Sequence, residues 1–228
     1  MFDGSDILYE DNHILAVLKR PGVLVQADSS GDSALEDEVK AFIKRRDSKK
    51  GAVFLGVIHR IDRPVSGVVV FAKTSKALAR MNEAMRSRDV VKRYFALVAQ
   101  IPERQEGELV HYIVRDGRKN RSYAYDTPRK EGKEARLRYR VAARSDRYIL
   151  LDIELITGRH HQIRAQLAKA LAPIKGDLKY GAPRSNPDGS ISLHARSVTF
   201  THPVTKERIT VTAPLPQERV WSLFSGVE

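Results

Sequence analysis

The sequence predicts an α+β fold in which a mixed, mostly antiparallel sheet carries a few inserted helices. Short apolar or alternating runs recur along the chain, and turn-like loops separate several of them as in hairpins. Few segments place their apolar residues at helical spacing. We find no internal repeat and no linker rich in Pro, Gly or Ser, so we expect residues 1–228 to form a single domain.

The chain before residue 90 contains four predicted strands. Residues 14–18 and 23–25 flank a Lys-Arg-Pro-Gly turn and predict an early hairpin. Residues 53–58 form the next predicted strand, and the apolar run 67–72 is typical of a buried one. The loop 59–66 between these last two strands is polar, which makes it a first place to look for functional side chains.

Two amphipathic helices are predicted in the same part of the chain. Ser33 is expected to cap the first helix, and Ser75 the second. Their apolar residues recur at helical spacing: Leu35, Val39 and Ile43 in the first, and Leu78, Met81 and Met85 in the second. The first helix ends in an exposed basic loop, residues 44–50.

The chain from residue 90 onward is predicted to be mainly strands. The expected strands are residues 90–99, 135–143, 148–156, 191–201 and 208–212. The second and third of these should pair antiparallel, and so should the last two. The basic stretches 115–121 and 129–133 are expected to be hairpin loops. Gly158 is expected to open a helix that runs through Ile163 and Leu167. Residues 216–224 are expected to form a short C-terminal helix.

The composition predicts a soluble protein with a polyanionic partner. Lys and Arg number 40 against 28 Asp and Glu, which gives a formal net charge of +12. Such an excess points to nucleic acid or, less often, to a membrane surface, although charge alone fits a merely basic protein equally well. The absence of cysteine excludes disulfides and Cys-based zinc sites. The acidic N-terminus and short apolar runs favour a cytoplasmic protein that does not enter a membrane.

Several common chemistries lack their motifs in this sequence. We find no phosphate-binding Gly-x-x-x-x-Gly-Lys loop, no Gly-x-Gly-x-x-Gly, no Gly-x-Ser-x-Gly and no His-Glu-x-x-His. His160 and His161 are adjacent, so on a helix they would point about 100° apart and could not share a metal. We therefore expect neither a cofactor nor a metal ion.

Two polar segments could carry chemistry. In the first, residues 59–63 (HRIDR), Asp62 lies between two arginines that should favour its charged form, as suits a nucleophile or base. Taken alone, the segment favours a structural aspartate at a strand end. In the second, residues 157–164 (TGRHHQIR), a glycine and arginines at a helix start suit phosphate or a carboxylate from elsewhere in the fold. A solvated basic helix end is the commoner reading of that run.

Together these segments resemble the RluA family of pseudouridine synthases. The family signature is His-Arg-Leu-Asp, two variable residues, Thr-Ser-Gly, an apolar strand and Ala-Lys; residues 59–73 here are HRIDRPVSGVVVFAK. Five further segments match in order: ILYEDNHILAVLKRPGVLV (7–25), KRYFALV (92–98), TGRHHQIR (157–164), GDLKYG (176–181) and LHARSVTFTHPVT (193–205). The matches cover nearly the whole chain, which makes them far more specific together than singly. Ile61 replaces the usual Leu, Val65 the usual Thr, and His160 fills a variable position.

The resemblance implies the pseudouridine synthase catalytic fold and the isomerisation of uridine to pseudouridine in a structured RNA, a reaction that needs neither ATP nor a redox cofactor. It implies that Asp62 is the catalytic carboxylate, which either attacks C1′ or takes a sugar proton. Tyr94 is expected to stack on uracil and to serve in proton transfer, the alternative being a tyrosine of the core. Arg164 is expected to pair with Asp62.

The remaining implied contacts concern the RNA. Arg60 is expected to fill the space that the flipped nucleotide leaves or to contact phosphate, and Ile163 to close the opposite face of the base or to be ordinary core. His59 is expected mainly as a structural hydrogen bonder beside the RNA. Arg159 and Lys92, which lie in matched motifs, are expected at the RNA, and the basic loops are expected to bind phosphates.

The resemblance starts by about residue 7, so no N-terminal S4-type RNA-binding domain is expected. Family members modify 23S rRNA or tRNA, and we favour rRNA here. The alternative from another class is a catalytically silent RNA-binding protein on the same fold. We expect a monomer with no obligate protein partner.

Overall fold

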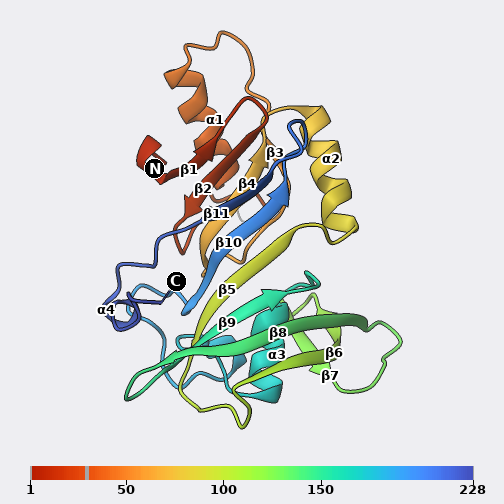
Figure 1. The fold of residues 1–228 in the computed structure, drawn as a ribbon, viewed down its shortest axis with the longest axis vertical. Helices are drawn as coiled ribbons and strands as arrows, with labels where there is room; N and C mark the ends of the chain where they lie inside the picture. Colours follow the sequence, from red (N-terminus) through yellow and green to blue (C-terminus); the bar gives the residue numbers. More distant parts are fainter. Residues whose placement is uncertain (1, 29–30, 228) are drawn as a thin grey trace. The chain divides into compact units, whose positions relative to one another are not determined.

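The computed structural model describes residues 2–28 and 31–227, and it confirms the α+β fold with a mixed, mostly antiparallel sheet. The chain divides into two compact units, Met1–Val90 with Ala195–Pro214 and Val91–His194 with Leu215–Glu228. Figure 1 labels the helices and strands of both. That the units together make up a single domain stays a prediction. Within the described residues, no helix has the length and apolar character that a membrane span requires.

The first unit is a sheet with two helices. Its strands are β1 (Ile7–Glu10), β2 (Ile14–Lys19), β3 (Gly56–Val57), β4 (Ser66–Ala72), β10 (Leu193–Thr201, in this unit from Ala195) and β11 (Arg208–Thr212). They lie in the order β1-β2-β4-β10, with β3 paired to β4 and β11 to β10. A short 3-10 turn, η1 (Gly4–Asp6), precedes β1, and the helices are α1 (Leu35–Arg46) and α2 (Ser75–Arg86).

The core of the first unit explains why β4 has no polar residue beyond Ser66. Every residue of β4 is buried, because β2 and β10 flank the strand and α2 packs across it (Figure 1). Apolar residues of β2, β4, β10, β11 and α2 form one cluster. An amphipathic helix over a central strand removes the most apolar surface from water, and each buried aliphatic side chain contributes roughly 1.5–3 kcal/mol. The cluster therefore fixes both ends of the loop 58–65, which carries Asp62.

The second unit is an antiparallel sheet. Its strands lie in the order β5 (Val91–Val98), β9 (Ile149–Leu155), β8 (Lys133–Arg144), β6 (Glu106–Asp116) and β7 (Arg121–Tyr125). Helix α3 (Gln162–Ala170) packs against β6 and β7. The 3-10 turn η2 (Leu178–Tyr180) contacts α3, and the short helix α4 (Arg219–Ser222) supplies Trp221 to a small core with Phe95 and Leu97.

Several predicted elements are confirmed with shifted boundaries. The strands expected at 67–72, 90–99, 135–143, 148–156, 191–201 and 208–212 are present as β4, β5, β8, β9, β10 and β11. β8 and β9 pair antiparallel as expected, and so do β10 and β11. The strand expected at 53–58 shrinks to β3, and the C-terminal helix shrinks to α4.

Other predictions are wrong. Residues 23–25 do not pair with β2, whose antiparallel partners are β1 and β4; Leu24 instead bridges Ala34 in parallel. The stretch 129–133 is not a hairpin loop, because it connects β7 to β8 and both of these strands pair with β6. The sheet order, which brings β6 between them, could not be read from local sequence.

Both expected helix caps are displaced by one residue. Ala34 rather than Ser33 precedes α1, and no side chain caps that end. At α2 the cap is Thr74, whose Oγ1 accepts a hydrogen bond from Ala77 N–H at 3.2 Å, so Ser75 is the first helical residue. Thr and Ser cap in the same way, and the extended backbone at Thr74 decides between them.

Gly67 at the start of β4 occupies a position that a side chain cannot share. Its φ is +123°, and a Cβ there would lie 2.3 Å from the carbonyl oxygen of Ala195 and 2.5 Å from its nitrogen. Both are backbone atoms, so the clash cannot be relieved by turning a side chain. The glycine of the signature is therefore required by the close approach of two strands.

Gly67→Ala is expected to lower the free energy of unfolding by about 2 kcal/mol or more, because of both the strained φ and the backbone clash. Urea unfolding followed by circular dichroism measures it. The control is Gly51→Ala in the same unit, where a Cβ meets nothing within 4 Å; it should stay within about 0.5 kcal/mol of wild type. Equal unfolding midpoints for the two variants would contradict the close approach.

Candidate active site

The loop 58–65 of the first unit holds Asp62 in a tight turn. The Asp62 carbonyl accepts a hydrogen bond from Val65 N–H at 3.0 Å, the closing bond of a β-turn. Asp62 is partly buried, while Arg60 and Arg63 on either side are exposed. Arg63 donates to the Asp32 carboxylate at 2.7 Å and to the Gly22 carbonyl at 2.9 Å. Arg63 thus ties the loop to the turn at residues 20–22.

A buried lysine holds the backbone of this loop by hydrogen bonds. Lys19, at the end of β2, is fully buried, and its ammonium donates to the carbonyls of Arg20 at 3.0 Å, Val23 at 2.8 Å and Arg63 at 3.0 Å. Burial lowers the pKa of Lys19 to about 7, while the negative charge of Asp62 opposes that fall and Arg63 adds to it. Lys19 therefore joins the 20–23 turn to the backbone next to Asp62.

His59 makes a backbone contact in the same loop. Its Nε2 accepts a hydrogen bond from Val70 N–H of β4 at 3.1 Å, and the ring is half-buried. An acceptor at Nε2 places the imidazole proton on Nδ1. This contact fits the structural part expected of His59, because it anchors the start of the loop to the strand that follows it.

In the second unit, β5 carries Lys92 and Tyr94. Tyr94 is buried, with 6% of its surface exposed, and pairs across the sheet with Ile153 of β9. Lys92 is partly buried, which lowers its pKa. The Lys92 Nζ lies close to the backbone of Gly158: a Cβ added at Gly158 would be 3.4 Å from this Nζ. Strand β5 and the segment before α3 are thus brought together at Lys92.

Helix α3 begins at Gln162 rather than at Gly158, which corrects the sequence prediction. His161 precedes the helix with φ 52° and ψ 27°, a left-handed conformation that a right-handed helix cannot include. The Gln162 side chain holds the turn: its Oε1 accepts from Thr157 Oγ1 at 2.7 Å and from Arg159 N–H at 3.0 Å, and its Nε2 donates to the Arg136 carbonyl at 3.0 Å. Residues 157–161 therefore form a fixed loop.

Arg164, on the first turn of α3, is held by a buried carboxylate. Its Nε donates to Asp177 Oδ2 at 2.7 Å and its Nη2 to Oδ1 at 2.9 Å, a bidentate pair between residues that are 4% and 1% exposed. The Tyr180 ring lies 5.0 Å from the guanidinium carbon. The Arg164 guanidinium has five N–H donors, and two of them are used in the pair with Asp177. Because the guanidinium is planar, this pair also sets the plane in which the other three donors lie.

Tyr180 extends this arrangement to β7 and to the two histidines. Its hydroxyl accepts from Ser122 N–H at 2.8 Å and lies 3.0 Å from His161 Nδ1. His160 and His161 do not point apart as on a helix; their rings stack with centroids 3.8 Å apart. Burial, and next the charge of Arg164, lowers the pKa of His161 to about 2, so this imidazole stays neutral.

A sequence profile for the family described as RNA pseudouridylate synthase matches residues 13–169. The chain belongs to this family. Ribosomal large subunit pseudouridine synthase D of Xanthomonas campestris pv. campestris is 33% identical over 93% of this chain, which spans 66% of that relative. The tRNA pseudouridine synthase C of Haemophilus ducreyi is 33% identical over 96% of this chain and 93% of its own length. These matches confirm the resemblance seen in the sequence.

Solved structures agree with the family. The human RNA pseudouridylate synthase domain containing 4 has a TM-score of 0.80 at 25% identity and covers 98% of this chain and 94% of its own. The human RNA pseudouridylate synthase domain containing 1 has a TM-score of 0.74 at 22% identity and shares the fold. The pseudouridine synthase fold expected from the resemblance is therefore confirmed.

The residues expected at the active site of this family member lie in both units. The first unit contains His59, Arg60 and Asp62, and the second contains Lys92, Tyr94, Arg159, Ile163 and Arg164. Arg159 is exposed and donates to the Glu134 carbonyl at 3.0 Å, whereas Ile163 is 5% exposed within α3. The expected pair between Asp62 and Arg164 would join the two units and stays a prediction.

Sequence reasoning missed the residues that hold these side chains in place. Lys19 lies in the turn that was assigned to a hairpin, and Asp177 and Tyr180 lie in GDLKYG, a matched motif to which no role was given. The signal available was charge: an aspartate in a segment with few other acids, and a lysine at the end of an apolar strand. Their partners are distant in sequence, so pairing them required the fold.

Asp177→Ala is expected to cost about 3–5 kcal/mol of unfolding free energy, because it leaves the buried guanidinium of Arg164 without its carboxylate. Trp221 is the single tryptophan and is buried in the second unit, so its fluorescence during urea unfolding reports on that unit. Asp146→Ala, in the exposed turn after β8, is the control and should change the midpoint little. A loss no greater than the control's would show that the pair is not stabilising.

The low pKa of Lys19 predicts a pH-dependent stability. Between the folded pKa of about 7 and the ordinary lysine pKa of 10.5, the unfolded chain binds more protons at this residue, so its contribution makes stability rise with pH. Lys19→Met removes the ionisable group. Unfolding free energies from pH 7 to above pH 9 should therefore rise less steeply, or fall more steeply, in Lys19→Met than in wild type. Parallel profiles would mean that Lys19 has an ordinary pKa.

Proposed function

We propose that this chain isomerises uridine to pseudouridine in a structured RNA, with Asp62 as the catalytic carboxylate. The observation that carries the proposal is the family match over residues 13–169, which includes the loop of Asp62, the strand of Tyr94 and the helix of Arg164. The reaction breaks the N1–C1′ bond of uridine and joins C5 to C1′. It changes neither composition nor oxidation state, so one carboxylate, a stacking group and a proton carrier are sufficient.

In this proposal Asp62 acts at the sugar, either by attack on C1′ or by removal of a neighbouring proton. Both steps need an ionised and well-aimed carboxylate. Arg164 is proposed as the cation that pairs with Asp62, and the bidentate contact with Asp177 supports the proposal because it fixes the direction of the guanidinium. The ammonium of Lys19 supplies a second positive charge, which interacts with the negative charge of Asp62.

Tyr94 is proposed to stack on uracil and to carry a proton late in the reaction. Its burial on β5 supports a fixed ring rather than a mobile one. Ile163 is proposed on the other face of the base. Arg60, which is exposed, is proposed to fill the space left by the flipped nucleotide or to contact phosphate. Arg159, which is also exposed, and Lys92 are proposed to contact the RNA. Flipping costs roughly a few kcal/mol, which these contacts offset.

We infer 23S rRNA as the substrate, because relatives of this chain act on the ribosomal large subunit by name. A specific observation favours tRNA as the second candidate: tRNA pseudouridine synthase C is as similar in sequence and matches over 93% of its own length. A silent RNA-binding protein on the same fold is a third, which the presence of Asp62, Tyr94 and Arg164 disfavours. We further propose a cytoplasmic monomer that acts as one catalytic domain.

Asp62→Asn is expected to abolish the release of tritium from RNA labelled at uracil C5, because the amide can neither attack carbon nor accept the proton. Binding of the same RNA should stay within a few fold of wild type. Assays on 23S rRNA and on tRNA, run side by side, decide between the two substrates. Asp146→Asn is the matched control and should turn over normally. Turnover by Asp62→Asn would remove Asp62 from its proposed role, and no release by wild type from any RNA would refute the enzyme.

A further inference from the structure

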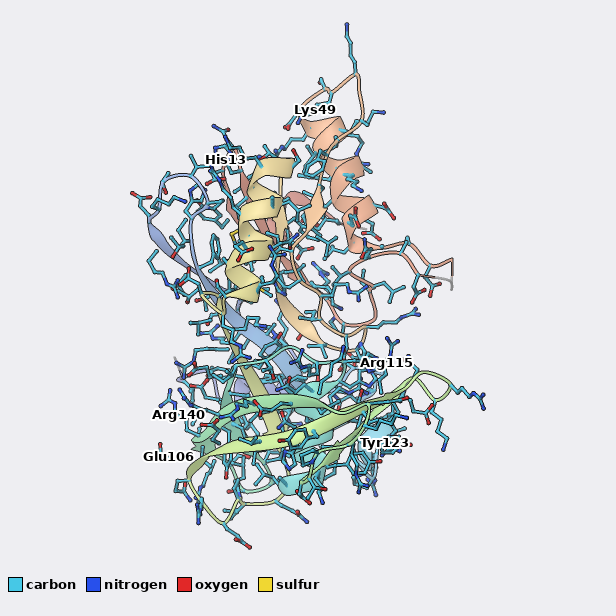
Figure 2. The ribbon with its side chains drawn as sticks, turned by 90° about the vertical axis from the view of Figure 1, so that its right-hand side faces the viewer. His13, Lys49, Glu106, Arg115, Tyr123 and Arg140 are labelled. Atoms are coloured by element: carbon cyan, nitrogen blue, oxygen red, sulfur yellow. The ribbon has the colours of Figure 1, made fainter. Side chains whose placement is uncertain are left out.

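The strands β6 and β7 form a two-stranded ribbon whose two faces differ. Opposite residues pair directly: Tyr112 with Tyr125, Ile113 with Ala124, Val114 with Tyr123 and Arg115 with Ser122. Because side chains alternate along a strand, residues 112, 114, 123 and 125 share one face, and residues 113, 115, 122 and 124 share the other. Tyr123 and Arg115 are labelled on this ribbon in Figure 2.

One face of the ribbon is fixed to the rest of the second unit. Ile113 and Ser122 are 4% and 1% exposed, and α3 packs against both strands. The backbone of Ser122 exchanges two hydrogen bonds with the Tyr180 hydroxyl, at 2.8 and 3.1 Å. The ribbon is therefore a rigid element, and its opposite face is presented in a fixed orientation.

The opposite face is aromatic and partly exposed. Tyr112, Val114, Tyr123 and Tyr125, which we call the tyrosine face, are all neither buried nor fully exposed. The Arg129 guanidinium lies 4.7 Å from the centre of the Tyr125 ring, and that of Arg121 lies 5.2 Å from Tyr123. A hollow of about 460 Å³ is bounded by Val114, Tyr125, Arg129 and Glu131. That volume is within the range of roughly 300–1,000 Å³ typical of small-ligand sites.

The ribbon that carries the tyrosine face and the loops at its ends have a net positive charge. Residues 112–133 contain seven Lys or Arg and three Asp or Glu, a net charge of +4. On the neighbouring strand β8, by contrast, the arginines lie beside carboxylates. There Arg136 and Arg138 lie 3.4 Å from Glu108, and Arg140 lies 2.8 Å from Asp152. Arg140 is labelled in Figure 2 with Glu106, its partner across β8 and β6.

We propose that the tyrosine face is a stacking platform for unpaired bases of the RNA substrate, separate from the nucleotide that reacts at Asp62. The proposal rests on the proposed function and deepens it, since it names what the enzyme recognises beside the target uridine. Tyrosine rings and the Arg129 guanidinium are planar groups on which bases stack, and the basic residues around them attract the phosphates between those bases. The hollow beside Tyr125 accommodates a base without displacing the ribbon.

Unpaired RNA fits this surface better than a duplex does. In an A-form helix the base faces are stacked on each other and are not available to a protein ring, whereas bases in loops and bulges can be splayed onto aromatic side chains. A duplex would reach the positive charges but not the rings. The platform therefore predicts a preference for single strands that disappears when the rings are removed.

The test is fluorescence anisotropy with a labelled single strand of about ten adenine and cytosine nucleotides, a length matched to single-strand sites. Without uridine, this strand cannot serve as substrate at Asp62. Tyr125→Leu, which keeps apolar bulk but removes the π face, should weaken binding about fivefold or more, and Tyr125→Phe should stay within about twofold of wild type. Binding of the corresponding duplex, in which every uridine of the complementary strand is base-paired, should be unchanged in both variants.

A second pair of variants tests the charge beside the ring. Arg129→Gln should weaken binding of the single strand more than Arg138→Gln, because Arg138 lies on β8 beside the Glu108 carboxylate and away from the tyrosine face. Crosslinking with 4-thiouridine placed in an otherwise uridine-free strand, followed by mass spectrometry, should label the segment 121–129.

The outcomes separate this proposal from the proposed function. If Tyr125→Leu binds the single strand as tightly as Tyr125→Phe, or if wild type does not bind it, the platform is refuted whatever the enzyme does. If the ring-dependent binding is found but wild type releases no tritium from any RNA, the platform stands and the isomerase proposal fails. A folded state common to all variants is checked by circular dichroism.

Discussion

The second unit depends on a buried ion pair. Moving a guanidinium and a carboxylate out of water costs several kcal/mol for each, and the pair is tolerated only where its geometry is good and its remaining donors are satisfied. Asp177 meets the first condition with two bonds to Arg164, and the Tyr180 ring covers the guanidinium. Because the Tyr180 hydroxyl is bonded to Ser122, the same cluster fixes α3, η2 and β7. The direction of Arg164 is thus set by the fold, so any anion that it binds meets a preorganised partner.

In the first unit, too, a buried charged group fixes the structure, but here it holds backbone carbonyls and not a side chain. A buried ammonium with three donors satisfies three carbonyls, and this is the arrangement that Lys19 makes with Arg20, Val23 and Arg63. A neutral amine has two N–H bonds and would leave one carbonyl without its donor, which links the protonation of Lys19 to the shape of the turn. Asp62 stabilises the charged form of Lys19, and Lys19 holds the backbone that carries Asp62. Loop and lysine therefore support each other.

The sequence predicted elements where one local pattern was sufficient. The apolar run of β4 and the helical spacing of Leu78, Met81 and Met85 each point to one structure. Prediction failed at two places. Residues 23–25 had strand-like composition, but Leu24 bridges the distant Ala34 instead of pairing with β2. The left-handed backbone of His161 delays the start of α3 by four residues. The same distinction holds at the site. Motifs identified Asp62, Tyr94 and Arg164 as candidates. The contacts of Asp177 with Arg164, and of Lys19 with the loop of Asp62, join segments that lie apart in the chain and could be found only from the fold.

The basic excess of the chain is unevenly distributed, and this bears on how it would hold RNA. On β8 the arginines lie beside Glu108 and Asp152, so carboxylates offset part of their charge. The exposed pairs of Arg136 and Arg138 with Glu108 add little stability. Net positive charge remains around the β6–β7 ribbon. Phosphate contacts lose affinity steeply as salt rises, because they release counterions, whereas stacking on an aromatic ring carries no such term. In the proposed platform, rings lie on a ribbon with an excess of cations: the charge attracts an RNA to the ribbon, and stacking on the rings favours bases that are unpaired.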